Sequence, residues 1–388
     1  MRYATRMPPN VPRLILVGVA LAIAFTIGEF STGAKVRERP EPADSAVGCN
    51  GTRLAAWTGP RWDQRVSTDG KKNGFIIGVS HERGGGHAIY AVDPAEGRLL
   101  RRSPVIPDFF HDLSVSPDGH RALLSSGRSL PDFQDEIRLI DLRNGLVDRV
   151  DVFAPHSVSG LAWAPDSAAY SILAQGRLLR GGVDSAELRK ITNASNSSFG
   201  ELAWSSTGDW IAFVNEGFAF DTYRSEITLI HPDGSDRHVL SEGVRGTIAW
   251  FPDGTRIAFS NGLGMSIATP EGDDVRHVTL TPAGTAEAGV SWSPDGRYLG
   301  FASSDHLTDL QPCLLSADGD LRLRARCGAE YVSTQQKITW SPDAQWLVVP
   351  SSRSCDESSP VLRLLAVEGT DIGRPLPYVL AAQWAPAE

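Results

Sequence analysis

The sequence lacks the short motifs that mark several common protein classes. Its four cysteines include no Cys-x-x-Cys pair and none close to a histidine, so no zinc-type metal site is expected. A Gly-x-Ser-x-Gly pentapeptide is absent, which argues against an α/β-hydrolase nucleophile. Acidic and basic residues are interspersed at a net charge of -9, without the basic stripe of nucleic-acid-binding proteins. We therefore expect no cofactor, no metal and no nucleic-acid partner.

Long apolar runs are also scarce, and the exception lies near the amino terminus. Leu14–Ile27 has 14 residues without a charge and follows three arginines. This run is short for a membrane span and typical of a signal sequence. Residues 1–34 are expected to form a signal peptide, with an uncleaved membrane anchor as the alternative, and residues 35–48 a charged linker. The remaining residues, 49–388, are expected to be extracytoplasmic.

What the sequence does contain is one phrase, repeated along most of its length. In Gly246–Ser260 (GTIAWFPDGTRIAFS), five residues ending in tryptophan precede a Pro-Asp-Gly turn and a second alternating run. The tryptophan position recurs at steps of 41 to 48 residues, at 115 (a valine), 163, 204, 250, 292, 340 and 384. A period in the forties, filled by short strands and turns, predicts an array of repeated β-sheet units.

Each copy has the pattern of a β-hairpin with one bulky face and one small face. In the Gly246–Ser260 copy the bulky face carries Ile248, Trp250, Ile257 and Phe259. The opposite face carries Ala249 and Ala258. Bulky faces that fit against the small faces of neighbouring copies stack radially, as the blades of a β-propeller do. The repeated tryptophans are therefore expected in the core, not in a ligand site.

The two ends of the repeat array are incomplete in complementary ways. Each phrase is followed by two further strands, so one blade has four strands. Phe75–Arg102 holds three strands without a phrase before them, and Tyr378–Trp384 is a first strand with nothing after it. We expect the carboxy-terminal strand to complete the amino-terminal blade, giving an all-β, seven-bladed propeller with paired ends. Six blades, or eight with Arg53–Trp57 as an added first strand, are the alternatives.

The four cysteines of an exported chain indicate two disulfides. Cys313 begins the third strand of its blade and Cys327 follows the fourth, so these two are expected to pair. Cys355 lies in a loop that a ring would place beside Cys49, which predicts the second disulfide. Free thiols are the alternative, because Cys313 and Cys355 also fall on one face of neighbouring blades.

The pattern (L/I)-A-W-S-P-D-G-x-x-(I/L)-A-F, followed by an Asp-Gly hairpin, resembles the TolB-type propeller repeat. The resemblance covers Phe75–Glu388. It implies a propeller like those of the periplasmic protein TolB and of prolyl-oligopeptidase-like peptidases. It implies no single activity, because the same repeat serves scaffolds, peptidase gates and some lyases. TolB itself typically has a separate α/β domain and six blades, and this sequence departs from both.

The loops that lead into the innermost strands are the expected binding face, because a ring gathers them around one mouth of its channel. They supply Phe109, Phe110, His111, Asp112, His156, Phe199, Glu201, Arg245, Glu287 and Lys337. Phe109 and Phe110 are the candidate anchors for a partner, with burial beneath the neighbouring loop as the alternative. His111 and His156 could ligate a metal or bind a carboxylate there, with locally hydrogen-bonded histidines as the alternative.

These observations favour a monomeric, non-catalytic, extracytoplasmic propeller that binds a protein, a peptide or a cell-envelope polymer. A second hypothesis is a lyase or hydrolase in which His111, His156 and an acid converge at the channel mouth. A third is a sensor or assembly component of an envelope complex, tethered by an uncleaved Leu14–Ile27.

Overall fold

A computed structural model describes most of the repeat region. The described residues are 74–81, 87–93, 98–103, 109–127, 134–153, 157–194, 201–219, 222–244, 247–260, 264–279, 285–304, 311–316, 324–327, 338–351, 361–367, 372–376 and 381–385. The chain divides into two compact units, Met1–Asp44 and Ser45–Glu388, and every described residue belongs to the second. The predicted signal or anchor segment, the linker and Arg53–Trp57 lie outside the described residues.

Every regular element in the described part is a β-strand, and the strands form seven antiparallel sheets of four. The first sheet contains β28 (Ala381–Ala385), β1 (Phe75–His81), β2 (His87–Asp93) and β3 (Arg98–Arg102), and the second contains β4 (Phe109–Val115), β5 (Arg121–Gly127), β6 (Asp135–Asp141) and β7 (Val147–Phe153). The third sheet contains β8 (Val158–Trp163), β9 (Ala169–Ala174), β10 (Arg177–Gly182) and β11 (Ser185–Asn193), and the fourth contains β12 (Leu202–Trp204), β13 (Ile211–Ala219), β14 (Thr222–Ile230) and β15 (His238–Glu242). The fifth sheet contains β16 (Ile248–Trp250), β17 (Ile257–Ser260), β18 (Gly264–Ala268) and β19 (Arg276–Thr279), the sixth contains β20 (Thr285–Trp292), β21 (Tyr298–Ser304), β22 (Gln311–Ser316) and β23 (Arg324–Cys327), and the seventh contains β24 (Thr339–Trp340), β25 (Trp346–Ser351), β26 (Val361–Ala366) and β27 (Ile372–Leu376). In this part of the chain no helix has the length and apolar character needed to span a membrane.

The repeated phrase forms the first hairpin of a sheet, as its alternation predicted. Between β16 and β17, Gly254 has a φ of 74° and its N–H donates to the carbonyl of Phe251 at 2.8 Å. Where the glycine is replaced, Ser167 and Ala344 adopt the same left-handed backbone at φ values of 58° and 57°. Such a conformation strains a residue that has a Cβ, so the turn geometry is imposed by the strands that flank it.

The bulky face of one sheet packs against the small face of the sheet before it. Trp292 and Phe301 pack with Ala249 and Ala258 in one buried cluster, and Trp250 packs with Ala212 in the next. Indole N–H groups cross the same boundaries to backbone carbonyls of the preceding sheet. The donors and acceptors are Trp163 to Ser114 at 2.8 Å, Trp250 to Ala203 at 3.3 Å and Trp340 to Ser291 at 3.1 Å. Four of the repeated tryptophans are buried, and Trp204 is half-buried.

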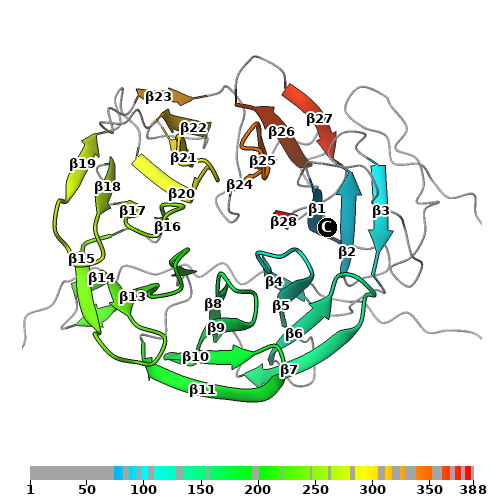
Figure 1. The fold of residues 1–388 in the computed structure, drawn as a ribbon, viewed down its shortest axis with the longest axis horizontal. Helices are drawn as coiled ribbons and strands as arrows, with labels where there is room; N and C mark the ends of the chain where they lie inside the picture. The colour runs from blue at the N-terminus through cyan, green and yellow to red at the C-terminus, as the bar shows by residue number, and fades with distance from the viewer. Residues whose placement is uncertain are drawn as a thin grey trace, which may run out of the picture. The chain divides into compact units, whose positions relative to one another are not determined.

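The first strands of successive sheets lie against one another. β4 contacts both β28 and β8, β12 contacts β8 and β16, and β20 contacts β16 and β24. β24 in turn contacts β28. In Figure 1 the labelled strands β4, β8, β16, β24 and β28 lie toward the centre, so the first strands of the sheets gather around one region of the fold.

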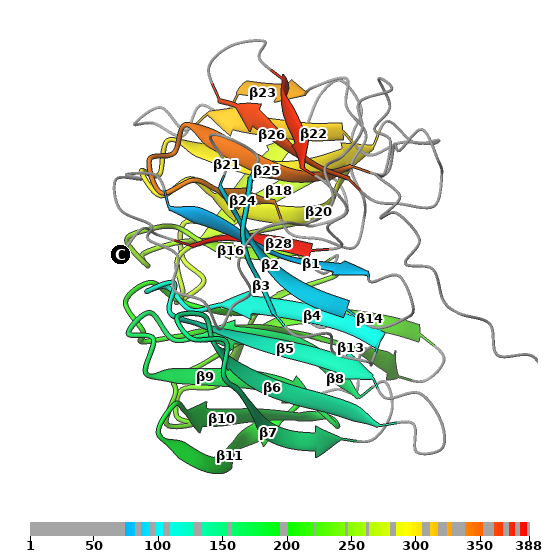
Figure 2. The ribbon, with the colours of Figure 1, turned by 90° about the vertical axis from the view of Figure 1, so that its right-hand side faces the viewer.

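The last described strand pairs with the first. β28 is antiparallel to β1, with Phe75 opposite Ala385 and Val79 opposite Ala381. In Figure 2 the red strand β28 lies beside the blue strand β1. The first sheet therefore combines one carboxy-terminal strand with three amino-terminal strands, as the two incomplete ends of the repeat array predicted.

The cysteine predictions are only partly covered by the described residues. Cys313 in β22 is 1% exposed and stands directly opposite Cys327 in β23. The Cys313–Cys327 disulfide stays a prediction that fits this register. Cys49 and Cys355 lie outside the described residues.

Candidate binding site at the start of strand β4

The structure changes where several predicted site residues stand. Phe109, Phe110, His111 and Asp112 were expected in a loop, but they lie inside β4, because β5 is long enough to pair as far as Gly127 opposite Phe109. Glu287 likewise lies inside β20 and not in the loop before it. Glu201 stands just before β12, as expected. The residues outside the described part are His156, Phe199, Arg245 and Lys337, and so are the side chains of Phe109 and Glu287.

Phe110 takes part in packing between the first two sheets. It is half-buried and packs against a cluster that includes Ile77 and Val79 of β1. Its ring centroid lies 6.1 Å from that of His87, which is 7% exposed. The alternative to an anchor role for Phe110 was burial beneath the neighbouring loop. The described contacts of Phe110 are instead with the neighbouring sheet.

His111 is the extra residue of a β-bulge. Phe110 is opposite Ser126 and Asp112 is opposite Ser125, so His111 has no partner position on β5. A bulge bends a strand and redirects the side chain of its extra residue. The imidazole Nε2 lies 3.6 Å from Oδ1 of Asp135, and the His111 side chain is 34% exposed. The bulge therefore places a solvent-accessible imidazole beside a carboxylate, at the end of the β4–β5 hairpin that is opposite its turn.

Asp135 connects this imidazole to the next sheet. It is the first residue of β6 and is 2% exposed. Its Oδ2 accepts backbone N–H groups from Ser157 at 2.8 Å and Val158 at 3.1 Å, where β8 begins. Hydrogen bonds to an ionised acceptor are among the stronger ones in proteins. Asp135 could not be predicted from the sequence, because it lies outside the repeated phrase. Its hydrogen-bond partners, Ser157 and Val158, lie where the next sheet begins.

The two other described acids of the predicted face stand on different sheets. Asp112 is half-buried in the second sheet, and its Oδ1 accepts the N–H of Leu113 at 2.8 Å. Glu201 is half-buried in the fourth sheet, where its backbone carbonyl accepts the N–H of Val214 at 3.0 Å. Across the ranges that the structure describes, no three His, Cys, Asp or Glu side chains form a group suited to hold a metal ion.

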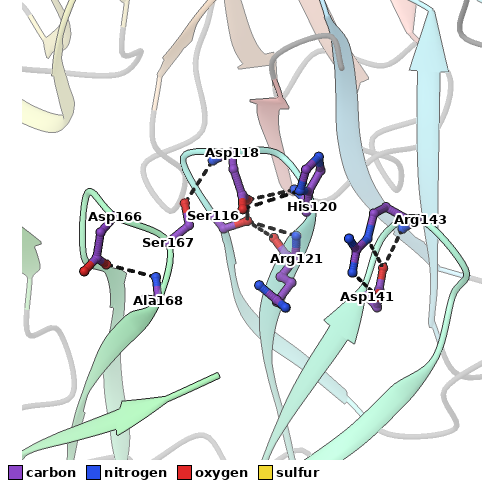
Figure 3. A network of polar contacts seen from close by, with 9 residues as sticks. All are labelled: Ser116, Asp118, His120, Arg121, Asp141, Arg143, Asp166, Ser167 and Ala168. Atoms are coloured by element: carbon purple, nitrogen blue, oxygen red, sulfur yellow. Dashed lines mark hydrogen bonds and ion pairs between the residues drawn. The ribbon is translucent and has the colours of Figure 1, made fainter. Parts of the chain in front are cut away.

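A second polar network lies at the other end of the β4–β5 hairpin (Figure 3). The Ser116 hydroxyl donates to Oδ1 of Asp118 at 2.6 Å and accepts the N–H of Arg121 at 2.9 Å. Asp118 Oδ1 also accepts the N–H of His120 at 2.9 Å. The N–H of Asp118 donates at 3.0 Å to the hydroxyl of Ser167, in the corresponding turn of the next sheet. The Ser-Pro-Asp motif therefore closes its own turn and joins neighbouring turns.

Two carboxylates of this turn type, Asp118 and Asp295, have lowered pKa values. Burial alone would raise the pKa of Asp118, but hydrogen bonds from Ser116 and His120 and the nearby positive charge of Arg121 outweigh it. Asp295 repeats the arrangement, with its pKa lowered mainly by hydrogen bonds from Ser293 and Arg297 against the opposing effect of burial. Because the same arrangement recurs in different sheets, we assign the network to structure and not to a ligand site.

Comparison with known proteins supports the fold and goes no further. No protein-family model and no curated protein sequence matches the chain. Among solved structures, the oligogalacturonate lyase of Vibrio parahaemolyticus is similar with a TM-score of 0.55 and 12% identity, over 79% of this chain and 86% of the lyase chain. A periplasmic gluconolactonase of Pseudomonas aeruginosa has a TM-score of 0.53 and 15% identity, over 81% and 98% of the two chains.

A third similar structure is a β-propeller domain of Myceliophteria thermophila, with a TM-score of 0.53 and 12% identity over 73% of this chain and 92% of that one. The chain has a propeller-type fold. At such low identity the similarity carries no activity or ligand from these proteins to this one. The TolB-type family assignment stays a prediction.

Proposed function

We propose that the protein is an extracytoplasmic, seven-bladed propeller that binds a protein, a peptide or a cell-envelope polymer at the mouth where its innermost strands begin. Seven four-stranded sheets, contacts from each first strand to the next and the β28–β1 pairing support a closed ring. The signal-like Leu14–Ile27 supports export, and one structural neighbour is a periplasmic enzyme. The propeller is expected to act as a monomer.

The observation that carries this proposal is the place of the His111 imidazole beside a buried carboxylate. The imidazole is one-third exposed, yet it lies beside a buried carboxylate that is itself tied to the backbone of the third sheet. A polar group held in one place before binding loses little conformational freedom when a partner arrives, which favours affinity. Among the described residues, His111 therefore lies at the centre of the proposed binding face, and Asp112 follows it on the same strand.

A binding experiment with a matched control tests this proposal. Full-length protein carrying His111→Ala would be compared with wild type in pull-downs from the protein fraction and from the polymer fraction of isolated cell envelopes. The control is His120→Ala, because the His120 side chain is also 34% exposed but lies in the turn at the other end of the hairpin. Capture that is lost in His111→Ala and kept in His120→Ala supports the proposal. Equal capture by both variants contradicts it.

A lyase or hydrolase is the second candidate, and the same histidine favours it. A carboxylate beside an imidazole can orient the ring and stabilise its protonated form, which suits proton transfer. Because the structural neighbours include an oligogalacturonate lyase and a gluconolactonase, oligogalacturonate and gluconolactone are the first substrates to assay. Turnover by wild type that disappears in His111→Ala would support an enzyme. Turnover that is absent, or unchanged in the variant, argues against this candidate.

The amino-terminal segment decides between a released and a tethered propeller. A signal peptide cleaved after the small residues that follow Leu14–Ile27 would release the chain, whereas an uncleaved segment would hold it at a membrane as a sensor or assembly component. Amino-terminal sequencing of the purified mature protein separates the two. A start near Lys35 supports release, and a chain that retains Leu14 supports the tether.

A further inference from the structure

We propose that Gly127 and Asp135 are positioning residues that together fix where the His111 imidazole stands at the proposed binding face. Gly127 supplies the space in which the ring lies, and Asp135 supplies the carboxylate that holds it there. The importance of this arrangement for ligand binding rests on the function proposed above. The arrangement itself can be tested without a ligand.

Gly127 is needed for space rather than for backbone freedom. It is the last residue of β5, paired with Phe109 on one side and with Asp135 on the other, and its φ is not in the left-handed region. A Cβ at this position would lie 2.5 Å from Nε2 of His111. That distance is too short for non-bonded atoms, but the nearest atoms all belong to the movable end of one side chain. Alanine would therefore displace the imidazole without breaking the strand.

Asp135 is held from two directions. Oδ1 faces the imidazole at 3.6 Å, while Oδ2 accepts the amide groups of Ser157 and Val158. At 2% exposure the carboxylate has no room to follow a moving ring, because interiors are close-packed. The position of His111 therefore depends on its own sheet, through the space at Gly127, and on the next sheet, through the hydrogen bonds of Asp135.

This arrangement makes residue 127 a determinant of specificity. Any side chain there would push the imidazole away from Asp135 and change the shape and polarity of the face near β4. A ligand matched to the wild-type ring position would lose its contact although His111 itself was still present, because binding depends closely on the placement of polar groups.

Carbethoxylation of histidines by diethyl pyrocarbonate, followed by mass spectrometry, tests the positioning directly. The measured quantity is the rate of modification of His111 divided by that of His120 in the same molecule, since the two side chains are equally exposed. We expect this ratio to rise in Gly127→Ala, where the ring is displaced toward solvent. It should rise also in Asp135→Asn, which keeps an oxygen for the Ser157 and Val158 amides but removes the charge.

Gly182→Ala is the matched control, because a Cβ there meets its nearest atoms at an ordinary 3.8 Å and its φ is not left-handed. It should leave the ratio at the wild-type value. A ratio unchanged in Gly127→Ala or in Asp135→Asn would overturn the role of that residue. A thermal unfolding curve of each variant shows whether the fold is retained, and a general loss of structure would raise both rates and not their ratio.

The second measurement is a pull-down from the cell-envelope fraction, protein or polymer, in which the wild type finds its partner. Gly127→Ala should lose as much capture as His111→Ala, and the double variant should lose no more than either one, since both changes remove the same contact. If His111→Ala binds like wild type, the proposed function fails, while the modification ratio still decides the positioning. If His111→Ala loses capture and Gly127→Ala keeps it, the function stands and the role of Gly127 is overturned.

Discussion

Gln383 in the last strand accepts a hydrogen bond from the backbone N–H of Val115, with its Oε1 at 2.5 Å. Gln383 stands opposite Ile77 of β1, whereas Val115 ends β4 in the second sheet. The carboxy-terminal strand therefore joins two sheets, one through main-chain pairing and one through a side chain. Val115 also occupies the position that the other copies of the phrase fill with tryptophan.

Replacing Gln383 by alanine should destabilise the fold. The half-buried N–H of Val115 would lose its acceptor, which costs about 1 kcal/mol for a partly buried donor. Chemical denaturation measures the difference. Gln345→Ala is the control, because Gln345 lies in an exposed turn and its side-chain amide donates to the carbonyl of Asp343 in the same turn. An equal loss of stability in both variants would contradict this role for Gln383.

Two buried tryptophans provide a test of the indole hydrogen bonds. Trp163 donates from Nε1 to the carbonyl of Ser114, whereas Nε1 of Trp292 is buried without a partner in the described structure. The two are matched otherwise, at 6% and 7% exposure and each with one edge-on aromatic neighbour, Tyr170 and Phe251 respectively. Trp163→Phe should therefore cost about 1 kcal/mol more than Trp292→Phe in the free energy of unfolding. Equal costs would show that the Ser114 contact contributes nothing.

The Ser116–Asp118 turn predicts a pH-dependent mutational effect. Although burial opposes it, the hydrogen bonds and positive charges around Asp118 hold its pKa below the ordinary 3.8. A lowered pKa contributes stability that is complete above pH 3.8 and is lost as the pH falls through the folded-state value. Ser116→Ala should therefore destabilise the protein at neutral pH, and the difference from wild type should shrink below pH 3.8.

Ser206→Ala serves as the control for this pH dependence. The Ser206 hydroxyl donates to the carbonyl of Phe251, so no carboxylate takes part in its contact. Its effect on stability, measured by urea unfolding across the same pH range, should stay constant. A Ser116→Ala effect that is equally constant would mean that Asp118 does not contribute through its charge.

The predicted Cys313–Cys327 disulfide can be checked by peptide mapping. The two residues are directly opposite each other on β22 and β23. Digestion without reducing agent should yield one linked peptide containing both, and reduction should separate it. Closing a loop of this length contributes about 3 kcal/mol in the chain-entropy description, so reduction should also lower the unfolding midpoint. Free thiols at either position would contradict the prediction.

The repeated phrase made the sheets predictable because each hairpin is specified locally. Turn residues and alternation within Gly246–Ser260 are enough to define two strands, and the division into bulky and small faces predicts how sheets pack. The partner of the last strand was also predicted from the repeat, because the two incomplete ends complement each other, although Arg53–Trp57 offered an alternative first strand. The structure pairs Ala381–Ala385 with β1 accordingly.

The candidate site was less predictable because it depends on departures from the repeat. The bulge at His111 and the length of β5 placed Phe109–Asp112 inside a strand, and no local pattern announces a bulge. Asp135 acquires its role only through Ser157 and Val158 in the next sheet. Phe110 is predicted as an anchor because it is aromatic and stands next to the start of an innermost strand, whereas its packing against the first sheet is a tertiary contact.

Quantitative binding of His111→Ala is the most direct test of the proposed binding face. Once a captured component of the cell envelope has been purified, its dissociation constant should be measured for the full-length wild type, His111→Ala and His120→Ala. We predict a weakening of about tenfold or more for His111→Ala, equivalent to about 1.4 kcal/mol, and no change for His120→Ala. Wild-type affinity in His111→Ala would contradict the claim that this histidine lies at the centre of the binding face.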